Sequence, residues 1–192
     1  LGYKFICGID EAGRGALAGP LVAGAVILKT SQAEIFNDSK ALTKNRREKL
    51  FDIITKTSIS WSVAIATVEE INKNGIQAAT YLCYERAIKL LSPQPNFLII
   101  DHYRLPGTFI PQLPITKGDK LSQSIAAASI VAKVYRDKLM SEIDLDFPDY
   151  KLKSNYGYGT SDHLKAISLK GPCEIHRKSF IDKPGSNQLN FI

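Results

Sequence analysis

Cysteine is scarce in this 192-residue sequence, and its placement argues against both a disulfide framework and a zinc site. Cys7, Cys83 and Cys173 lie far apart, without the CxxC spacing of zinc sites, and their number is odd. Sparse cysteine of this kind is typical of proteins in a reducing compartment. The cysteine content therefore favours a cytoplasmic protein.

Long hydrophobic runs are also lacking, which argues against a membrane protein. No apolar stretch approaches the ~20 residues that a membrane-spanning helix needs. Residues 1–5 lack the charged-then-apolar layout of a secretory signal. No internal repeat or low-complexity segment divides the chain. Its length and its hydrophobic share of 44% predict one globular domain over residues 1–192, with a flexible tail from about residue 183. We expect a cytoplasmic monomer.

Basic residues outnumber acidic ones. The sequence has 25 Lys and Arg against 19 Asp and Glu, which gives a formal charge of +6 and a pI near 9.2. This balance favours polyanionic partners such as nucleic acids, because each neutralised phosphate releases counterions. Four basic residues cluster in one segment: Lys40, Lys44, Arg46 and Arg47. The cluster is either a solvated helix face or a set of phosphate contacts, and Lys40 is our candidate for a phosphate contact.

The hydrophobic pattern predicts strands that alternate with helices. Apolar runs predict strands at residues 5–9, 20–28, 59–68, 97–100 and 113–116. Capping signals and amphipathic spacing predict a loop over residues 146–159 and helices that follow Thr43 and span residues 68–74, 76–91, 122–140 and 161–169. This order predicts an α/β fold in which helices flank a mixed β-sheet, with a small helical C-terminal portion.

Two adjacent carboxylates, Asp10 and Glu11, follow the first predicted strand. Hard divalent cations prefer carboxylate oxygens as ligands, and a strand end holds such ligands rigidly. The next residues, Gly13-Arg14-Gly15, let the backbone turn and approach a ligand closely. A solvated acidic turn is the alternative for an isolated Asp-Glu pair. The Gly-Arg-Gly segment, in a basic protein, favours the ligand site.

Three further acidic residues are candidates for the same site. Asp101 follows the apolar run 97–100, so two strand ends of one small sheet can bring their carboxylates together, although a single Asp there is commonly a turn former. Asp119 precedes the predicted helix 122–140 and is either a ligand or a residue placed for the helix dipole. Asp137 competes with Asp119 as the fourth ligand, although a surface ion pair with its basic neighbours explains it adequately.

With these segments in view, the sequence resembles a known family, ribonuclease HII, the type 2 ribonuclease H of bacteria. Five segments carry the resemblance in order along nearly the whole chain: Asp10-Glu11-Ala12-Gly13-Arg14-Gly15, Asp38-Ser39-Lys40 with Leu42, SIAAASIVAKVYRD ending at Asp137, Asn155-Tyr156-Gly157-Tyr158-Gly159-Thr160 with His163, and His176-Arg177 with Ser179-Phe180. The sequence departs from the family pattern at two places. Ala16 stands where the family usually has Pro, and His102 where Gly is common; neither change removes a carboxylate.

The resemblance implies a ribonuclease H-like fold and a site of four carboxylates, Asp10, Glu11, Asp101 and Asp119. Such a site would hold two Mg²⁺ or Mn²⁺ ions ~4 Å apart, one activating water and the other stabilising the departing 3′ oxygen. The implied enzyme is an endonuclease that hydrolyses the RNA strand of RNA–DNA hybrids and cuts 5′ to ribonucleotides embedded in duplex DNA. It would leave a 3′-hydroxyl and a 5′-phosphate, and would serve ribonucleotide excision and RNA primer removal.

Recognition of RNA needs a group that senses the 2′-hydroxyl, because this group separates RNA from DNA. The backbone of Gly13-Arg14-Gly15 suits this task, and the Arg14 side chain can also reach a phosphate. Tyr158, between two glycines, resembles the family tyrosine that stacks on the sugar just after the ribonucleotide. The alternative for Tyr158 is a loop aromatic that covers the edge of the core.

The tail holds a further candidate, a peptide for a protein partner. Gln188-Leu189-Asn190-Phe191-Ile192 follows a Pro-Gly-Ser stretch and resembles the short peptides by which bacterial replication proteins bind the sliding clamp. A disordered end without a partner is the alternative.

Two other functions compete with the implied one. The first is a related nuclease, either ribonuclease HIII or a DNA-directed enzyme of the same fold, and the Gly-Arg-Gly and Gly-Tyr-Gly segments argue against it. The second is a non-catalytic nucleic-acid-binding module, which would lack an acidic ligand, whereas all four candidates are present.

Overall fold

The computed structural model describes residues 2–29 and 43–181. The elements follow one another in the order β1 (Ile6–Ala12), β2 (Leu21–Ile27), α1 (Lys44–Thr57), β3 (Ser60–Ala66), α2 (Val68–Lys89), β4 (Phe97–Asp101), β5 (Gln112–Ile115), α3 (Gly118–Leu121), α4 (Gln123–Asp146), η3 (Pro148–Tyr150), α5 (Leu152–Asn155), α6 (Ser161–Lys170) and α7 (Lys178–Ile181). Lys40 and the clamp-like peptide 188–192 lie outside the described residues.

The five strands form one mixed sheet in the order β3-β2-β1-β4-β5. β1 pairs antiparallel with β2, and β2 pairs antiparallel with β3. On its other side β1 pairs in parallel with β4, and β4 pairs in parallel with β5. β1 is therefore central, and its carboxyl end lies beside the carboxyl end of β4. The predicted mixed sheet is confirmed.

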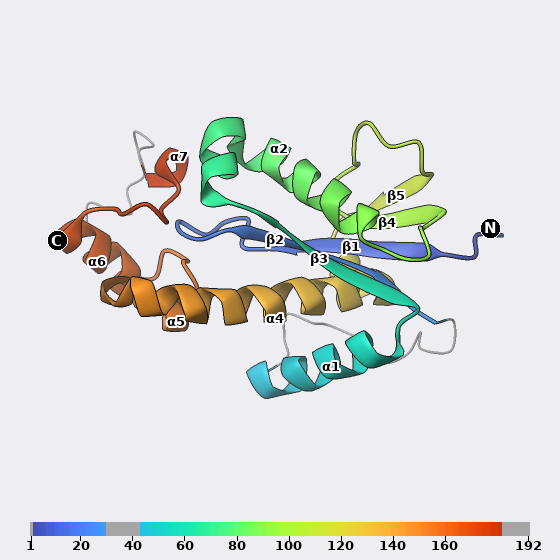
Figure 1. Ribbon diagram of the computed structural model, residues 1–192, viewed down its shortest axis with the longest axis horizontal. Coiled ribbons are helices and arrows are strands. Elements are labelled where there is room, and N and C mark those ends of the chain that lie inside the picture. Colours follow the sequence, from blue (N-terminus) through green and yellow to red (C-terminus); the bar gives the residue numbers. More distant parts are fainter. Residues whose placement is uncertain (1, 30–42, 182–192) are drawn as a thin grey trace.

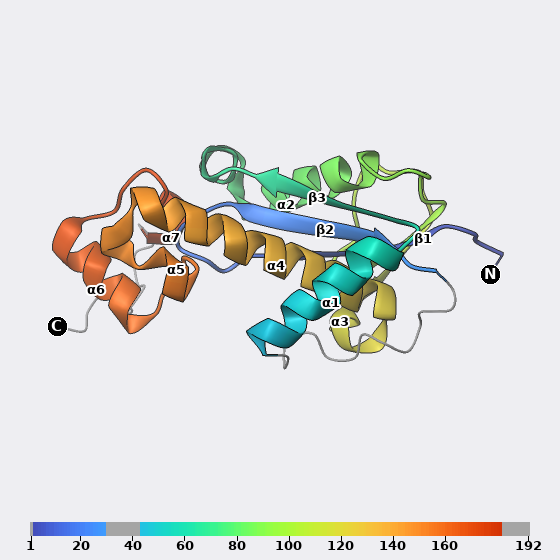
Figure 2. The ribbon, with the colours of Figure 1, turned by 60° about the horizontal axis from the view of Figure 1, so that its bottom comes forward.

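Helices cover both faces of this sheet (Figure 1). α2 packs on one face against β2 and β3, and α4 packs on the other face against β1 and β2. α1 lies against α4 on the outer side of that second layer, as Figure 2 shows from below. Each face of the sheet has its own hydrophobic core, which makes the domain a three-layer structure.

The Ala-rich first half of α4 lies very close to the sheet. A Cβ atom at Gly8 of β1 would overlap the backbone of Ser124, and a Cβ atom at Gly24 of β2 would overlap the backbone of Ala128. These strand glycines therefore allow the helix backbone to approach the strands directly. The approach fixes the side chains of α4 relative to the end of β1, where the carboxylates are.

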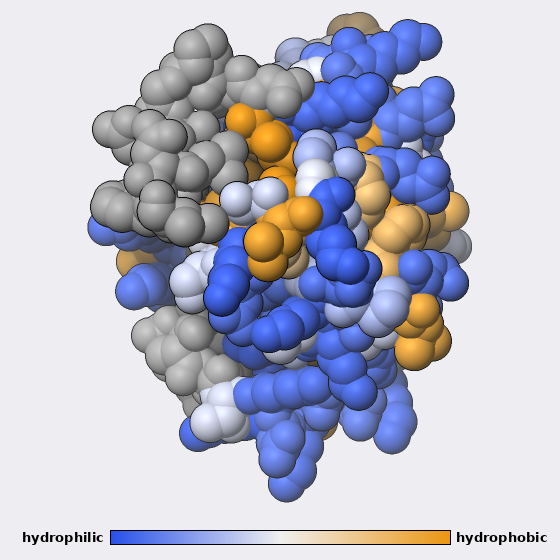
Figure 3. Space-filling view, turned by 90° about the vertical axis from the view of Figure 1, so that its left-hand side faces the viewer, coloured by the Kyte–Doolittle hydropathy of each residue, from blue (hydrophilic) through white to orange (hydrophobic). Residues whose placement is uncertain are grey.

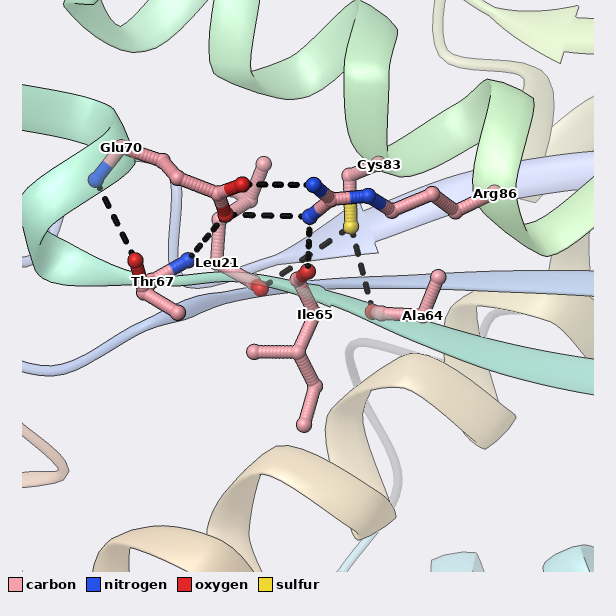
Figure 4. A network of polar contacts seen from close by, with 7 residues as sticks. All are labelled: Leu21, Ala64, Ile65, Thr67, Glu70, Cys83 and Arg86. Carbon is pink, nitrogen blue, oxygen red and sulfur yellow. Dashed lines mark hydrogen bonds and ion pairs between the residues drawn. The ribbon is translucent and has the colours of Figure 1, made fainter. Parts of the chain in front are cut away.

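α2 begins with a capping box that is also tied to β3 (Figure 4). The backbone N–H of Thr67 donates to Glu70 at 2.9 Å, and Glu70 returns a backbone N–H to the Thr67 hydroxyl. Arg86, four turns later, donates to Glu70 and to the carbonyl of Ile65 at 3.0 Å. The predicted break at Gly75 is confirmed, since this residue has non-helical angles inside α2 (φ 78°, ψ 159°).

The chain after α4 forms a small helical portion with a hydrophobic cluster of its own. Ala18 and Met140 join residues of η3, α5 and α6 in this cluster. Figure 3 views this end of the molecule and shows mostly hydrophilic side chains with small, separate hydrophobic patches. Within the ranges that the structure describes, no helix combines the length and the apolar character needed to cross a membrane.

Two local predictions are wrong. Residues 146–159 are not all loop, because η3 and α5 lie within them, and neither α3 nor α7 was predicted. Strand β1 extends to Ala12, so Asp10 and Glu11 belong to the strand itself instead of following it. Both η3 and α5 are about one turn long, which is too short to produce a hydrophobic period in the sequence.

Candidate active site

Three acidic residues come together at the carboxyl ends of β1 and β4. The parallel register pairs Ile9 with Ile100, so Asp10 and Asp101 occupy the next position on neighbouring strands. Glu11 follows Asp10 on β1, and successive residues of a strand point to opposite faces of the sheet. Asp10 therefore faces α4 and Glu11 faces α2. All three side chains line one pocket of about 380 Å³.

Asp10 is buried in this pocket, with 3% of its surface exposed. Burial raises its pKa well above the usual range, and the negative charges of Glu11 and Asp101 raise it further, whereas a contact with Ser129 lowers it. The backbone N–H of Glu11 donates to Asp10 Oδ1 at 2.7 Å. The second oxygen, Oδ2, is buried and accepts no hydrogen bond from the described residues.

Glu11 accepts a hydrogen bond from the hydroxyl of Tyr84, a buried residue of α2. Burial raises the pKa of Tyr84 far above its ordinary value, and the nearby charges of Glu11 and Asp10 add to the effect. Tyr84 therefore stays protonated and remains a hydrogen-bond donor to Glu11. No sequence signal marks Tyr84, because it lies in the middle of a helix, 73 residues from its partner.

Asp101 is connected to α3, which carries the fourth candidate ligand. The backbone N–H of Gly118 donates to Asp101 Oδ1 at 2.7 Å. Asp119 is the next residue, but its side chain is buried, with 2% exposed, and it does not line the pocket. No group of three or more His, Cys, Asp or Glu side chains in the described ranges is arranged to hold a metal ion as it stands. The structure thus brings Asp10, Glu11 and Asp101 into one pocket and leaves Asp119 beside it.

Asp137, the competing candidate, lies further along α4. It forms an ion pair of 2.8 Å with Lys133, one turn before it, and lines a separate hollow between α1 and α4. The expected ion pair therefore exists, but its partner is not an immediate sequence neighbour, and Asp137 is buried instead of lying on the surface. Lys133 itself lines the carboxylate pocket, together with Arg47 of α1. The spacing of four residues on a helix is the signal that could have paired Asp137 with Lys133.

The Gly13-Arg14-Gly15 loop forms one wall of the pocket, and two buried arginines lie beside it: Arg136 packs against Gly13, and Arg177 bonds to the backbone of Arg14. Arg136 donates to the carbonyls of Pro20, Tyr156 and Ala18 at 2.9, 2.8 and 3.2 Å. Arg177 donates to the carbonyls of Gly19 and Arg14 at 2.9 and 3.0 Å. Burial lowers the pKa of both guanidinium groups, to about 9 for Arg177. Sequence reasoning missed both roles, since the bonds to Pro20 and Gly19 span 116 and 158 residues.

The side chain of Arg14, a residue that lines the pocket, is held by contacts with α2 and with Tyr103. Its guanidinium donates to Thr80 at 2.8 Å and to Gln77 at 2.5 Å, both on α2, and it stacks on Tyr103 with 4.6 Å between Cζ and the ring centroid. Gly15 is exposed, and a Cβ atom there would meet nothing within 4 Å. All three residues of the loop line the pocket.

Tyr158 lines the same pocket from the C-terminal portion. Its ring lies beside two cationic groups, with Lys133 Nζ at 5.5 Å and Arg136 Cζ at 5.4 Å from the centroid. Four of the predicted substrate-binding residues, Gly13, Arg14, Gly15 and Tyr158, thus line the pocket that holds the carboxylates. The fifth, Lys40, is outside the described residues.

His102, one of the two departures from the family pattern, adopts a left-handed backbone with φ 62°. Glycine adopts this conformation without strain, which gives a physical reason for glycine at the position. The His102 side chain is exposed and its ring contacts Tyr103.

Comparison with known proteins gives a consistent family. The family model described as Ribonuclease HII matches residues 7–183. A ribonuclease HII from Caldicellulosiruptor saccharolyticus is 48% identical over 181 residues, which cover 94% of this chain and 88% of the relative. A ribonuclease HII from Lachnoclostridium phytofermentans is 51% identical over 180 residues, which cover 93% of this chain and 71% of the relative.

Solved structures with lower sequence identity share the fold. The ribonuclease H2 of Pyrococcus horikoshii superposes with a TM-score of 0.77 at 23% identity, covering 92% of this chain and 93% of that chain. A ribonuclease HII from Archaeoglobus fulgidus, solved in complex with PCNA, has a TM-score of 0.73 at 24% identity, covering 91% and 94%. Bst-RNase HIII, solved in complex with Mn²⁺, has a TM-score of 0.68 at 18% identity, covering 87% and 63%. The predicted ribonuclease H-like fold is confirmed.

Proposed function

We propose, from the premise that this chain belongs to the ribonuclease HII family, that it hydrolyses the RNA strand of RNA–DNA hybrids and cuts 5′ to ribonucleotides embedded in duplex DNA. One observation carries the proposal. The pocket that collects Asp10, Glu11 and Asp101 is walled by the Gly13-Arg14-Gly15 loop and Tyr158. Groups suited to the reaction and groups suited to reading the sugar therefore face the same space.

The residues of the pocket fit a site for divalent cations. Their donors are carboxylate oxygens, which Mg²⁺ and Mn²⁺ prefer. Asp10 Oδ2 is buried without a hydrogen-bond donor from the described residues, and three acidic side chains share the space. Asp10, Glu11, Asp101 and Asp119 would hold the ions. When bound, two such ions supply an activated water and stabilise the charge on the departing 3′ oxygen. The Mn²⁺ complex of the structurally similar Bst-RNase HIII supports this choice of cation.

The charges of the acidic side chains in the pocket favour the binding of a cation. Asp10 binds a proton more tightly than an ordinary Asp because Glu11 and Asp101 lie near it in a buried place. A divalent cation offsets the same repulsion, so cation binding and loss of the Asp10 proton are linked. Asp119 must also turn toward the pocket to act as a ligand, since it does not line the pocket here. We infer that the Asp119 side chain would rotate toward the pocket when it serves as a ligand.

The loop and Tyr158 would select the substrate. The Arg14 guanidinium is engaged by Thr80 and Gln77, so we infer that the backbone of Gly13-Arg14-Gly15 contacts the 2′-hydroxyl. The ring of Tyr158 would pack on the sugar that follows the ribonucleotide. Arg47 and Lys133 line the pocket and supply positive charge for phosphates, together with Lys40 of the same basic cluster as Arg47.

A test of this function compares cleavage of three duplexes with Mg²⁺ and with Mn²⁺: an RNA–DNA hybrid, DNA with one embedded ribonucleotide, and DNA alone. We expect cuts in the first two, on the 5′ side of a ribonucleotide, with products that a ligase accepts because they carry 3′-hydroxyl and 5′-phosphate ends. Cleavage of the all-DNA duplex would identify a DNA-directed nuclease of this fold instead. Binding without cleavage under every condition would identify a non-catalytic binding module.

Replacement of single acids by Asn assigns the ligands. We expect Asp101→Asn and Asp119→Asn each to abolish turnover while the fold is retained, and Asp137→Asn to keep most activity because Asp137 pairs with Lys133. Asp149, an exposed residue paired with Lys170, is the matched control for the loss of one carboxylate. Full activity of Asp119→Asn together with an inactive Asp137→Asn would reverse the assignment of the fourth ligand.

We also propose that the peptide Gln188 to Ile192 binds the sliding clamp. The peptide resembles clamp-binding peptides, and the ribonuclease HII of Archaeoglobus fulgidus, which was solved in complex with PCNA, supports a partner of this kind. Such a contact would bring the enzyme to sites of ribonucleotide excision and RNA primer removal. Deletion of residues 187–192 is expected to abolish binding to the clamp without changing cleavage of a short duplex. Unchanged clamp binding after the deletion would exclude this role for the peptide.

A further inference from the structure

Two histidines are buried in the C-terminal portion, away from the carboxylates. His163 lies on α6 and His176 lies in the segment before α7, and both are almost fully buried. Their Nε2 atoms are 3.2 Å apart. His163 Nδ1 is 2.9 Å from the carbonyl oxygen of Tyr158, and His176 Nδ1 is 3.0 Å from the backbone nitrogen of Cys173. The two rings therefore connect the backbone of Cys173 to the backbone of Tyr158, a residue that lines the pocket.

The direction of each hydrogen bond in this chain follows from the groups at its two ends. A backbone N–H can only donate, so the Cys173 N–H donates to an unprotonated Nδ1 of His176. The carbonyl oxygen and the Sγ atom of Cys173 both lie further from the same atom, at 3.3 Å, and the thiol can also donate to an unprotonated Nδ1. The proton of neutral His176 is then on Nε2 and is donated to Nε2 of His163. His163 consequently carries its proton on Nδ1 and donates it to the Tyr158 carbonyl.

Both rings are held in the neutral form that this chain needs. Burial lowers the pKa of His163, and burial together with the neighbouring His163 lowers the pKa of His176 to about 4. The ring of Tyr150 packs on His176 with 4.7 Å between the centroids, and its hydroxyl donates to the carbonyl of Gly171. At neutral pH neither histidine gains a second proton, so the direction of the hydrogen bonds is constant.

Backbone hydrogen bonds hold the segment around Tyr158: its N–H donates to the carbonyl of Asn155 at 2.9 Å, and the Gly157 carbonyl accepts from Leu17 at 2.8 Å. The two residues before Tyr158, Tyr156 and Gly157, both have left-handed backbone angles, so the segment is not part of a helix or strand. The Tyr158 carbonyl also accepts from the backbone N–H of Thr160 at 2.8 Å. The His163 ring is thus the one side chain among the described residues with a hydrogen bond to the Tyr158 backbone that is recorded in the structure. Movement of this carbonyl would move the ring that faces the pocket.

We propose that His163 is a positioning residue that holds Tyr158 in the pocket, and that His176 selects the tautomer with which it does so. The inference rests on the proposed function, in which Tyr158 contacts the sugar of the substrate. In this arrangement a chain of hydrogen bonds runs from the backbone of Cys173 through His176 and His163 to Tyr158. The histidines themselves do not contact the substrate.

Two replacements of His163 separate the hydrogen bond from the bulk of the ring. The amide nitrogen of Asn can take the place of Nδ1, whereas Leu offers no donor. With DNA that contains one ribonucleotide, we expect His163→Leu to lower kcat/KM about tenfold, as loss of one well-placed hydrogen bond does, and His163→Asn to stay within about threefold of the wild type. Equal losses in both variants would overturn the proposal.

A double-mutant cycle distinguishes positioning of Tyr158 from a general effect on the fold. In a Tyr158→Ala background the ring is gone, so His163→Leu should change kcat/KM less than about twofold further. If His163→Leu costs the same factor with and without the Tyr158 ring, His163 does not act through Tyr158. Thermal unfolding of each variant shows whether the compared proteins are folded.

Nuclear magnetic resonance tests the chain without any cleavage. The ¹⁵N shifts of the wild-type protein at neutral pH should show His163 protonated on Nδ1 and His176 on Nε2. The opposite tautomers, or a charged ring, would overturn the proposal even if the protein is an active nuclease. Conversely, a wild type that cleaves no ribonucleotide substrate contradicts the proposed function; the inference about His163 is then decided by whether the Tyr158 signals shift in His163→Leu but not in His163→Asn.

Discussion

Gly13 offers the sharpest test of how the substrate loop is held. Its backbone is left-handed, with φ 89°, and a Cβ atom there would lie 2.6 Å from Cδ of Arg136 and closer still to its Nε. In Gly13→Ala the left-handed angle costs about 1–2 kcal/mol. The added methyl group must also displace the Arg136 side chain, which is buried and donates to three backbone carbonyls.

The cost of that displacement sets the size of the effect. Loss of one hydrogen bond from a charged group costs about 1.5–3 kcal/mol. Together with the backbone strain, this loss predicts that Gly13→Ala lowers the free energy of unfolding by about 2.5–5 kcal/mol. In a protein of this size that corresponds to a fall in Tm of roughly 5–20 °C. Calorimetry or circular dichroism measures the difference directly.

Two other glycines provide matched controls. Gly107 has a left-handed backbone with φ 74° but nothing within 4 Å of a Cβ atom, so Gly107→Ala reports the backbone strain alone and should cost a few degrees. Gly15→Ala meets neither strain nor a neighbour, and should change the unfolding free energy by less than about 0.5 kcal/mol. If Gly13→Ala melts like Gly107→Ala, Arg136 does not hold the loop as described.

The remaining predictions concern the titratable groups. Asp10→Asn should leave the metal-free protein at least as stable as the wild type at neutral pH, because a carboxylate with a raised pKa is destabilising once ionised. The same substitution should abolish cleavage. A variant that is less stable than the wild type in EDTA would contradict the repulsion of Asp10 by Glu11 and Asp101. The folded pKa of His176 is about 4, below the value of about 6.5 in an unfolded chain. The unfolded state therefore binds the extra proton first, and the free energy of unfolding falls as pH is lowered from about 6.5 towards 4. We expect this fall to be steeper in the wild type than in His176→Asn. Urea titrations at several pH values compare the two proteins. Burial raises the pKa of Cys7 and of Cys83 to about 12. A thiol reagent should therefore modify only the partly exposed Cys173 in the native protein, and all three cysteines after denaturation. Rapid labelling of two or more thiols in the native protein would contradict the burial of Cys7 and Cys83.

Much of the site follows from the sequence because its key residues stand at strand ends. Apolar runs before Asp10 and Asp101 identified two strands, and the parallel pairing of β1 with β4 brings those residues side by side. The caps were equally local: Thr43 begins α1 and Ser122 begins α4 through side-chain contacts within three residues. Period and capping are short-range signals, so they are readable in one sequence.

The contacts that fix the loops were beyond such reading. Arg136 and Arg177 appear in the sequence as ordinary basic residues, but each is buried and bonds to backbone carbonyls more than one hundred residues away in the chain. The hydrogen bond from Tyr84 to the Glu11 carboxylate also joins residues far apart in the chain, 73 positions from each other. Carbonyl acceptors belong to every residue, so no residue type or spacing marks the partner of a buried arginine. The orientation of Asp119 likewise depends on how α3 packs and not on any local motif.

Diffraction from a crystal soaked in Mn²⁺ would test the central claim most directly, because anomalous scattering locates the ion without reference to activity. We predict a peak in the pocket between Asp10, Glu11 and Asp101, with the Asp119 carboxylate rotated toward it. Peaks only at other places, or none at millimolar Mn²⁺, would contradict the claim that these strand-end carboxylates form the catalytic cation site.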